Sequence, residues 1–342
     1  MKNEKSTPIL KNYDYNLQKA EDELTRIYGK RYTTYRNNYQ AACRFEFEPE
    51  FPLYLMIEQT YSCNLKCPSC IHGFPEDKKK FNSDTKVMPR DLFEQIIIEG
   101  EKNNCPSISF HVNDEPLIVP DLPDRIAYAK EHGFMDLFIV TNGTLLNPKL
   151  TKDLIDAGLT RILFSIDAAT SATYEKVRPG LKGGFEQICK NLNFLVETKK
   201  SRNLILPATR ASFVESEINR HETEEFIKKF SKLVDYIDIQ GFSSYYDRNL
   251  DLIPKDAKKA EYKCSAPWRE LIIRANGDVL PCCTFYGYEI VVGNIYETSL
   301  KDIYQGKLVK QLRKEFKEGV YTLPVCQACT DSFYVVKETS KS

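Results

Sequence analysis

Three cysteines in one short segment are the residues of this sequence best suited to carry chemistry. They are Cys63, Cys67 and Cys70, in the segment TYSCNLKCPSC. Three thiols this close cannot all pair as disulfides without leaving one over, and their spacing lets one loop surround a cuboidal iron–sulfur cluster. Three ligands on a four-iron cluster leave one iron open to another molecule, much as a catalytic zinc ion keeps one position free. A partial zinc site is the alternative interpretation.

A second set of cysteines lies near the end of the chain. It consists of Cys264, Cys282, Cys326 and Cys329, and the last two form a Cys-Gln-Ala-Cys pair. A glycine that suits a turn, Gly277, lies between the first two. Four thiolates make a closed site, which could hold zinc or a second iron–sulfur cluster.

The elements that would position these cysteines follow from the hydrophobic pattern. Six short runs rich in Ile, Val and Phe predict strands, and amphipathic stretches between them predict helices. Six β-then-α units in succession predict a parallel sheet with right-handed crossovers, either a doubly wound sheet or most of a TIM-like barrel. The predicted strands are Leu53–Glu58, Ser107–Val112, Leu137–Thr141, Arg161–Ile166, Ala208–Val214 and Tyr236–Gln240.

Capping residues predict where several helices begin and end. Pro89 begins one helix, Asn147 caps another that Gly158 ends, and Asn219 with Glu222 resembles a capping box. Further expected elements are helices near 15–28, 184–200 and 299–317, and a hairpin at 270–280.

Composition and charge exclude several classes of function. The chain has 342 residues, of which 42% are hydrophobic, and this is enough to build a sizeable core. Lys plus Arg and Asp plus Glu both number 48, so no overall positive field attracts nucleic acid or an anionic membrane. No apolar run approaches the roughly 18 residues of a membrane span, and no secretory signal is recognised. Eleven cysteines without an export signal favour thiols and metal ligands. We therefore expect a soluble, cytoplasmic protein.

The Cys63 loop, placed directly after the first predicted strand, resembles the hallmark of the radical SAM superfamily. The resemblance implies a partial (β/α)6 barrel and a [4Fe–4S] cluster whose open iron binds S-adenosylmethionine (SAM). It also implies reductive cleavage of SAM to methionine and a 5′-deoxyadenosyl radical, which abstracts a hydrogen atom from the substrate. A reductant such as flavodoxin or ferredoxin is then an expected partner.

Other positions match this family one at a time. The segment Asn113-Asp114-Glu115-Pro116 is similar to the family's Gly-Gly-Glu-Pro motif, although both glycines are replaced. Arg178 and Arg210 are rival candidates for the SAM carboxylate, because arginine binds carboxylates through two hydrogen bonds. For each polar residue, a strand-end cap or a turn is the alternative role. The residues expected to bind SAM are Glu115, Pro116, Asn142, Ser165, Asp167, Arg178 and Arg210.

The C-terminal cysteines and their context, LIIRANGDVLPCC and LPVCQAC, resemble the SPASM extension of radical SAM enzymes. The resemblance implies an auxiliary [4Fe–4S] cluster. Because no cysteine follows Cys329, we expect one auxiliary cluster, with zinc as the alternative. The expected regions are an N-terminal extension at 1–50, the barrel at 51–242, a linker or active-site loop at 243–259 and a small Cys-rich α+β domain at 260–335.

Three further side chains are candidates for catalysis. Cys283 could return a hydrogen atom to a substrate radical, or could be a structural neighbour of the auxiliary site. His111 ends a predicted strand and could point into the barrel. Tyr245 lies in segment 240–248, whose phenol, Asp247 carboxylate and guanidinium groups suit a polar substrate; an ordinary solvated loop is the alternative.

The sequence does not identify the reaction, and three hypotheses are kept. Our first hypothesis is oxidation or epimerisation of a polar small molecule, such as a carbohydrate or aminocyclitol. The short region before the barrel weakens the alternative of a peptide maturase, whether an epimerase or a cross-linker, because such relatives often carry a larger recognition domain there. A non-catalytic metal-binding scaffold is the third hypothesis, and it predicts no SAM cleavage.

Overall fold

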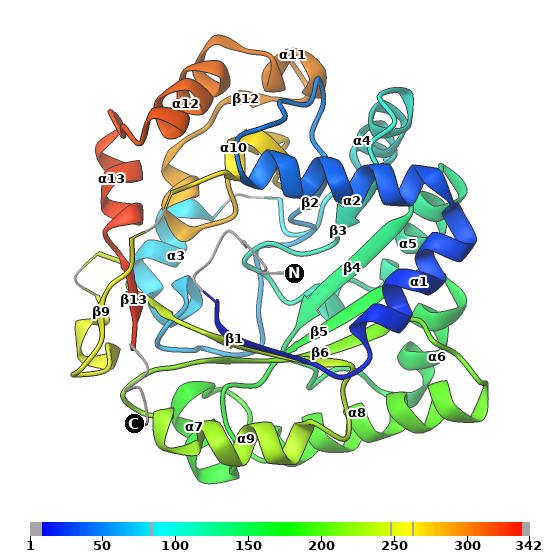
Figure 1. The fold of residues 1–342 in the computed structure, drawn as a ribbon, viewed down its shortest axis with the longest axis vertical. Coiled ribbons are helices and arrows are strands. Elements are labelled where there is room, and N and C mark those ends of the chain that lie inside the picture. Colours follow the sequence, from blue (N-terminus) through cyan, green and yellow to red (C-terminus); the bar gives the residue numbers. More distant parts are fainter. Residues whose placement is uncertain (1–8, 83–84, 247, 262, 337–342) are drawn as a thin grey trace.

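Six parallel strands form the centre of the main sheet in the computed structural model, which describes residues 9–82, 85–246, 248–261 and 263–336 (Figure 1). The order along the sheet is β7-β6-β5-β4-β3-β2, and each strand is parallel to the next. This confirms the six predicted strands and the parallel sheet. Their bounds are β2 Tyr54–Ile57, β3 Ser107–Ser109, β4 Asp136–Thr141, β5 Arg161–Ser165, β6 Ala208–Val214 and β7 Tyr236–Gln240.

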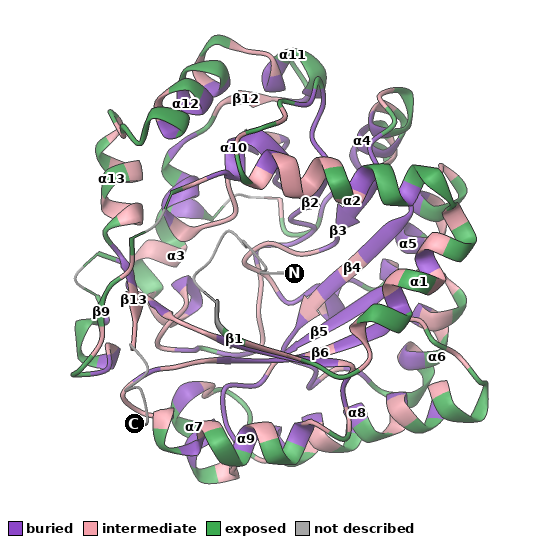
Figure 2. Cartoon of the chain, in the orientation of Figure 1, coloured by how far each residue is buried: buried purple, intermediate pink, exposed green. Residues whose placement is uncertain are grey.

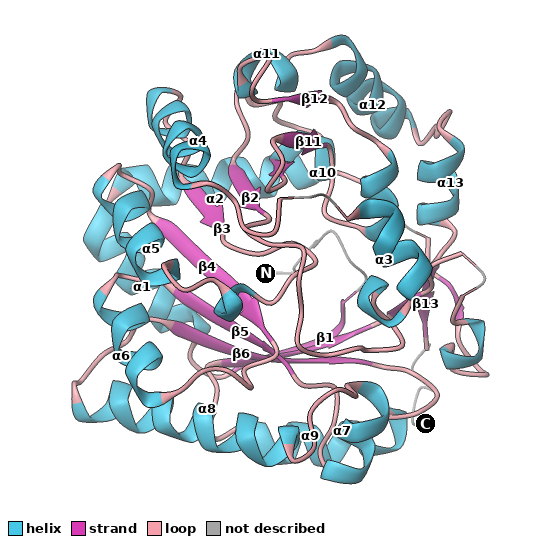
Figure 3. Ribbon diagram, turned by 180° about the vertical axis from the view of Figure 1, so that it is seen from behind, coloured by secondary structure: helices cyan, strands magenta, loops and turns pink. Residues whose placement is uncertain are grey.

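Helices cover the outer face of this curved sheet, as Figures 1 and 3 show from opposite sides. Apolar residues of α4, such as Phe93 and Ile97, pack against strand residues such as Leu55 and Ile108 in one continuous core. Figure 2 shows buried strands and helices whose outer faces are exposed. The fold is therefore a mixed α/β fold with the parallel sheet of a partial TIM-like barrel. The covering helices are α4 Arg90–Lys102, α5 Leu122–Glu131, α6 Pro148–Asp156, α7 Ser171–Val177, α8 Gly184–Ser201 and α9 Thr223–Phe230.

The predicted ends of α6 are confirmed. The Asn147 side chain accepts a hydrogen bond from the backbone N–H of Leu150 at 2.9 Å, as an N-cap residue does. Gly158 follows the helix with φ of +92°, a conformation that glycine adopts without steric cost.

The N-terminal region adds a strand and an unpredicted helix. Strand β1 (Ile9–Asp14) pairs antiparallel with β7, and helices α1 (Leu17–Tyr28) and α2 (Lys30–Cys43) follow. Both helices contact the first residues of the barrel strands: Arg161 of β5 donates to Tyr32 Oη at 2.7 Å and to Glu21 at 2.9 Å. Helices α1 and α2 thus lie at the end of the barrel opposite to the carboxyl ends of its strands, whereas β1 extends the sheet at the β7 edge.

The C-terminal region continues the barrel sheet. The predicted hairpin is confirmed as β10 (Glu270–Ile273) and β11 (Asp278–Leu280), and β10 pairs parallel with β2. The single helix expected at 299–317 is wrong, because two helices form there and residues 305–306 separate them. The remaining elements of this region are β8 Phe242–Ser243, β9 Lys258–Lys259, α10 Ala266–Arg269, β12 Gly293–Asn294, α11 Leu300–Tyr304, α12 Lys307–Glu318, α13 Pro324–Thr330 and β13 Phe333–Val335.

Five short 3-10 helices complete the described structure. They are Ile71–Gly73, Pro116–Ile118, Arg220–Glu222, Leu250–Leu252 and Phe285–Glu289, and one short α-helix, α3 (Pro75–Phe81), follows the first of them. Within the described ranges, no helix combines the length and the apolar character needed to cross a membrane. The region boundaries expected from the sequence remain a proposal.

Candidate metal and cofactor site

The three clustered cysteines lie in the loop that follows β2, at the carboxyl end of the barrel strands. Cys67 is buried, and Cys63 and Cys70 are partly buried. Burial raises the pKa of Cys63 and of Cys70 to about 11, and that of Cys67 to about 12. A metal or cluster bound here must therefore displace the thiol protons, and its binding free energy stabilises the loop in return.

Arg178 connects this loop to the end of β5. Its Nη1 atom donates to Cys67 Sγ at 3.8 Å, and its other terminal nitrogen forms an ion pair with Asp167. The Asp167 backbone has φ of +58°, and its Oδ1 accepts a hydrogen bond from the N–H of Val214 at 2.8 Å. A cationic donor aimed at a cysteine sulfur favours its thiolate form, which is the form that binds iron.

The segment after Arg178 packs directly on the cysteine loop. The N–H of Lys66 donates to the carbonyl of Pro179 at 2.8 Å. Gly180 has φ of +130°, and a Cβ atom there would lie 3.0 Å from both the Asn64 carbonyl oxygen and the Leu65 Cα atom. This close approach of two backbones requires glycine, and it holds the outer side of the loop in place.

Asn142 and Glu115 brace the loop from the other side. Asn142 Nδ2 lies 3.9 Å from Cys63 Sγ and donates to Asn64 Oδ1 at 2.9 Å. The Glu115 carboxylate accepts from the N–H of Asn142 at 2.8 Å and from Thr141 Oγ1 at 2.5 Å. Burial raises the pKa of Glu115 to about 7, although these hydrogen bonds favour its ionised form. Glu115 therefore ties its own loop to the end of β4.

The expected capping box of Asn219 and Glu222 is wrong, and its residues support this site instead. Asn219 Nδ2 donates to the carbonyl of Asp167 at 2.8 Å. The Glu222 carboxylate accepts from the N–H groups of Ala169 at 2.6 Å and Thr170 at 3.1 Å. Both side chains thus hold the turn that follows β5, where Asp167 adopts a positive φ.

The two rival arginines lie in different places. Arg178 lies against the cysteine loop, whereas Arg210 of β6 donates to the buried Asp238 of β7 at 3.1 Å. Burial and then the charge of Arg210 lower the pKa of His111 to about 3, so the imidazole is neutral at pH 7. His111 Nδ1 accepts from the N–H of Val140 at 3.2 Å, so Nε2 carries the proton. Arg210 and His111 therefore lie near one another in the barrel.

The other predicted SAM-binding residues lie at a strand end or in the loop that follows one. Ser165 is the last residue of β5, and Pro116 begins the 3-10 helix Pro116–Ile118. Together with Glu115, Asn142 and Asp167, these residues follow the carboxyl ends of β3, β4 and β5, where barrel folds place their chemistry.

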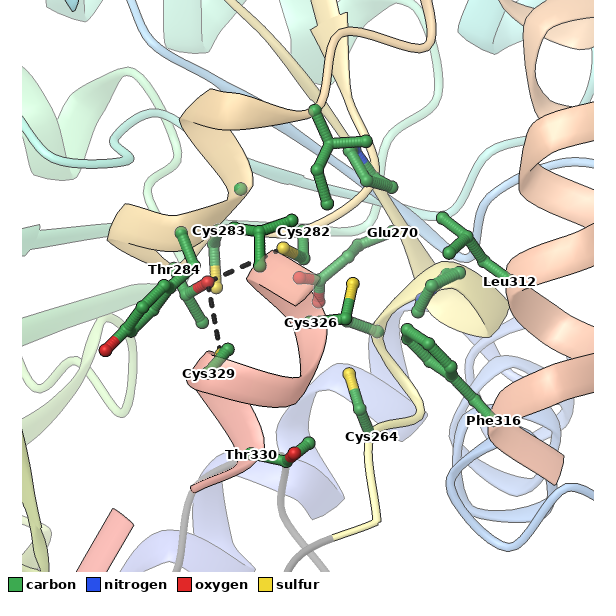
Figure 4. A pocket seen from close by; sticks show the side chains of 17 residues that line it. Cys264, Glu270, Cys282, Cys283, Thr284, Leu312, Phe316, Cys326, Cys329 and Thr330 are labelled. Carbon is green, nitrogen blue, oxygen red and sulfur yellow. Dashed lines mark hydrogen bonds between the residues drawn. The ribbon is translucent and has the colours of Figure 1, made fainter. Parts of the chain in front are cut away.

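The second cysteine set lines one pocket, drawn in Figure 4. Cys264, Cys282, Cys326 and Cys329 all reach it, from the segment before α10, the segment after β11, and α13. Thr284 Oγ1 lies 3.6 Å from the Sγ atoms of both Cys282 and Cys329.

A glycine permits the close packing around this pocket. A Cβ atom at Gly287 would lie 2.7 Å from Cys282 Sγ and 2.5 Å from the carbonyl oxygen of Cys282. Sequence reasoning missed both Thr284 and Gly287, because neither belongs to the cysteine spacing that indicated the site.

Cys283 also lines this pocket, and its thiol interacts with the buried carboxylate of Glu270. Burial, and then the charge of Glu270, raise the pKa of Cys283 well above its usual value. Glu270 in turn accepts a hydrogen bond from Tyr54 Oη on β2. Cys283 therefore lies between the auxiliary pocket and the first barrel strand, and its catalytic role remains a prediction.

Tyr245 is buried rather than solvated. It is 1% exposed and its ring contacts Phe74, Tyr246, Phe285 and Tyr286. The solvated-loop interpretation is therefore wrong for this residue. Asp247, the carboxylate expected beside it, lies outside the described residues.

The donor set at both sites fits iron–sulfur clusters. Within the ranges described above, no three His, Cys, Asp or Glu side chains are arranged to hold a single metal ion. Both sites nevertheless offer cysteine sulfur, the usual ligand of such clusters, and hydrogen-bond donors reach it from Leu65 N, Arg178 and Asn142 at the first site. The assignment of the seven cysteines as ligands remains a proposal.

Two family models match the chain. A model described as "Radical SAM superfamily" matches residues 57–208, and the SPASM model, described as "Iron-sulfur cluster-binding domain", matches residues 264–330. The two matches cover the first and the second cysteine set, respectively.

The chain is also similar to curated relatives and, in its fold, to solved structures. The tungsten-containing aldehyde ferredoxin oxidoreductase cofactor-modifying protein of Pyrococcus furiosus is 26% identical, over 84% of this chain and 90% of its own length. The antilisterial bacteriocin subtilosin biosynthesis protein AlbA of Bacillus subtilis is 25% identical over 76% of this chain, which spans only 61% of AlbA. The crystal structure of BtrN with AdoMet and 2-DOIA has a TM-score of 0.51 at 19% identity, covering 79% of this chain and 89% of BtrN.

Proposed function

Since this chain is a radical SAM enzyme with a C-terminal SPASM iron–sulfur domain, we propose that it oxidises or epimerises a polar small molecule. The observation that supports the radical SAM chemistry in this proposal is the convergence of Cys67, Arg178 and Asp167 on one side of the cysteine loop and of Cys63, Asn142 and Glu115 on the other. The choice of a polar small molecule is argued separately below from Arg210 and His111.

We assign Cys63, Cys67 and Cys70 to a [4Fe–4S] cluster that also binds SAM. When bound, the cluster and SAM supply the one-electron chemistry that removes a hydrogen atom from a substrate carbon. The chain's own residues bind, orient and shield this group. Asn142 and Arg178 donate to two of the sulfurs, and Cys67 is buried away from water.

Arg178 is our candidate for the SAM carboxylate. Its Nε atom is buried and has no hydrogen-bond partner among the described residues, so the guanidinium has a donor left for a ligand. The ion pair with Asp167 fixes the orientation of the guanidinium. Arg210 has an unpartnered Nε atom as well, but its ion pair with Asp238 places it in the barrel beside His111.

We therefore assign Arg210 and His111 to the substrate. Arg210 offers a cationic donor, and the neutral His111 offers its Nε2–H, so both groups suit oxygen atoms of a polar molecule. The relative from Pyrococcus furiosus, which carries "cofactor-modifying" in its name and matches over most of both chains, favours a small molecule.

Peptide maturation is the second candidate function. It is favoured by the similarity to AlbA, a bacteriocin biosynthesis protein, over 76% of this chain. In either function we assign Cys264, Cys282, Cys326 and Cys329 to one auxiliary [4Fe–4S] cluster, which would accept the electron of an oxidation.

The proposal is tested with anaerobically reconstituted protein, dithionite and SAM. We expect about eight iron atoms per chain and the release of 5′-deoxyadenosine, and about four iron atoms and no release in the variant with Cys63, Cys67 and Cys70 changed to Ala. Absence of deoxyadenosine from the unaltered protein would refute the assignment.

The type of reaction is tested in D2O with candidate sugars, aminocyclitols and peptides. If a product contains deuterium, and this deuterium is absent when the Cys283→Ala variant is used, the result supports epimerisation with this thiol as the hydrogen donor. A product oxidised by two electrons without deuterium supports a dehydrogenase, and a modified peptide supports the second candidate function.

A further inference from the structure

One hydroxyl group at the auxiliary pocket reaches two of its cysteine sulfurs. Thr284 Oγ1 forms hydrogen bonds of 3.6 Å with Cys282 Sγ, in the same segment, and with Cys329 Sγ of α13 (Figure 4). The two cysteines belong to segments that are far apart in the sequence. This threonine side chain therefore lies between two of the proposed ligands of the auxiliary cluster.

The local backbone does not explain why a threonine occupies this position. Thr284 is the N-cap residue of the 3-10 helix Phe285–Glu289, and a threonine side chain at an N-cap commonly accepts a hydrogen bond from the helix. The Thr284 side chain forms no such cap hydrogen bond. Its hydroxyl is therefore available to the cysteine sulfurs.

Two other hydroxyl side chains described around this pocket have backbone partners instead. Thr330 Oγ1 donates to the carbonyl of Gln327 at 3.0 Å, and Tyr286 Oη donates to the carbonyl of Ser244 at 3.2 Å. Thr284 differs from both, because its hydroxyl faces sulfur atoms.

The surroundings of these sulfurs strengthen such a hydrogen bond. Much of the pocket lining is apolar and buried, as at Ile290, Leu312 and Phe316. A hydrogen bond to a charged group is electrostatically stronger there than in water. A cysteine that ligates iron has lost its proton, so the threonine hydroxyl must then be the donor and the sulfur the acceptor.

We propose that Thr284 raises the reduction potential of the auxiliary cluster by donating a hydrogen bond to the sulfur of Cys282 or Cys329. The proposal rests on the proposed function, which assigns these cysteines to a [4Fe–4S] cluster. A hydrogen bond to a ligand sulfur stabilises the reduced cluster more than the oxidised one, because the reduced form carries one more negative charge. A higher potential makes the cluster a better acceptor for the electron of an oxidation.

The experiment measures the potential of the auxiliary cluster alone. The background is the full chain with Cys63, Cys67 and Cys70 changed to Ala, reconstituted anaerobically and titrated with dithionite while EPR follows the reduced cluster. In this background, Thr284→Val removes the hydroxyl at nearly constant volume, and Thr284→Ser keeps it. Thr330→Val is the matched control, because it removes a hydroxyl from the same pocket that is bonded to the backbone.

The expected effect is confined to the loss of the Thr284 hydroxyl. We expect Thr284→Val to lower the ratio of reduced to oxidised cluster about tenfold at a fixed ambient potential, which is a shift of about 59 mV to more negative values for one electron. We expect Thr284→Ser and Thr330→Val to titrate like the background, with about four iron atoms per chain throughout. The carboxylate of Glu270 also lines the pocket, but it is present in every variant and does not contribute to these differences.

Several results would overturn the proposal. An unchanged potential in Thr284→Val would do so, and so would an equal shift in Thr330→Val. If Thr284→Val does not retain iron, Thr284→Ser is compared with Thr284→Ala, since these two differ only in the hydroxyl, and equal potentials in this pair would overturn the proposal. Absence of iron from the background itself is a different result, because it would refute the auxiliary cluster of the proposed function.

Discussion

Changing Gly180 to Ala tests whether the brace against the cysteine loop is needed for iron binding. Gly180 has φ of +130°, a region that side-chain-bearing residues rarely adopt, and the cost there is of order 1–3 kcal/mol. The new Cβ atom would also lie 3.0 Å from the backbone of Asn64 and Leu65. Backbone atoms cannot rotate away as a side chain can, so overpacking adds about 1–3 kcal/mol.

Gly183→Ala is the matched control, three residues away. Gly183 also has a positive φ, +71°, but the nearest atom to its Cβ position is the Glu186 carboxylate oxygen, at 3.9 Å. The control therefore carries only the conformational cost, about 1–2 kcal/mol. Because only Gly180→Ala also brings its Cβ atom against the backbone, we expect it to destabilise the packed loop by about 2 kcal/mol more than Gly183→Ala. This difference corresponds to roughly a thirtyfold change in the equilibrium between the packed and the released loop.

The assay is iron per chain after identical anaerobic reconstitution, together with the free energy of unfolding in urea. We expect Gly180→Ala to lose iron from the first site and, with it, the EPR signal that changes when SAM is added. We expect the auxiliary cluster of this variant to be retained. We expect Gly183→Ala to keep both. Equal iron content in the two variants would refute the argument that the close backbone contact holds the loop.

Three further predictions follow from the same contacts. Arg178→Lys should weaken SAM binding about tenfold or more in calorimetry, because a lysine ammonium cannot hold Asp167, the Cys67 sulfur and a carboxylate in the fixed geometry of the guanidinium. Arg210→Lys should leave SAM affinity unchanged, and equal losses would reject the assignment. Burial of Glu21 favours a raised pKa, but the charges of Arg161 and Arg36 outweigh it and lower the pKa to about 2, below the usual value of 4.5. The unaltered chain should thus exceed Glu21→Gln in unfolding free energy by about 2 kcal/mol at pH 7, and this difference should shrink as pH falls below 4.5 toward 2, so a difference constant down to pH 3 would contradict it. Gly287→Ala should displace Cys282 and lower auxiliary iron while the first site stays loaded, and an unchanged iron count would contradict this.

The parts of the site that are local in the chain could be predicted from the amino-acid sequence. Three cysteines within eight residues must share one loop whatever the rest of the fold does, and the alternation of apolar runs gave the six strands with bounds close to those observed. The hairpin at 270–280 and the cap at Asn147 are also local, because a turn and a helix end are specified by neighbouring residues.

Several relations between distant residues follow only from how the chain packs in three dimensions. Arg178 and Arg210 have the same side chain, and only the packing of 178–180 on the cysteine loop placed one of them at the cluster ligands. Asn219 and Glu222 have the spacing of a helix cap, yet they hold the turn after β5, since buried backbone N–H and carbonyl groups near Asp167 need partners that their own strand does not supply. The pairing of β10 with β2 likewise depends on which strand edge of the barrel is unpaired, and the spacing of residues along the chain does not indicate which edge that is.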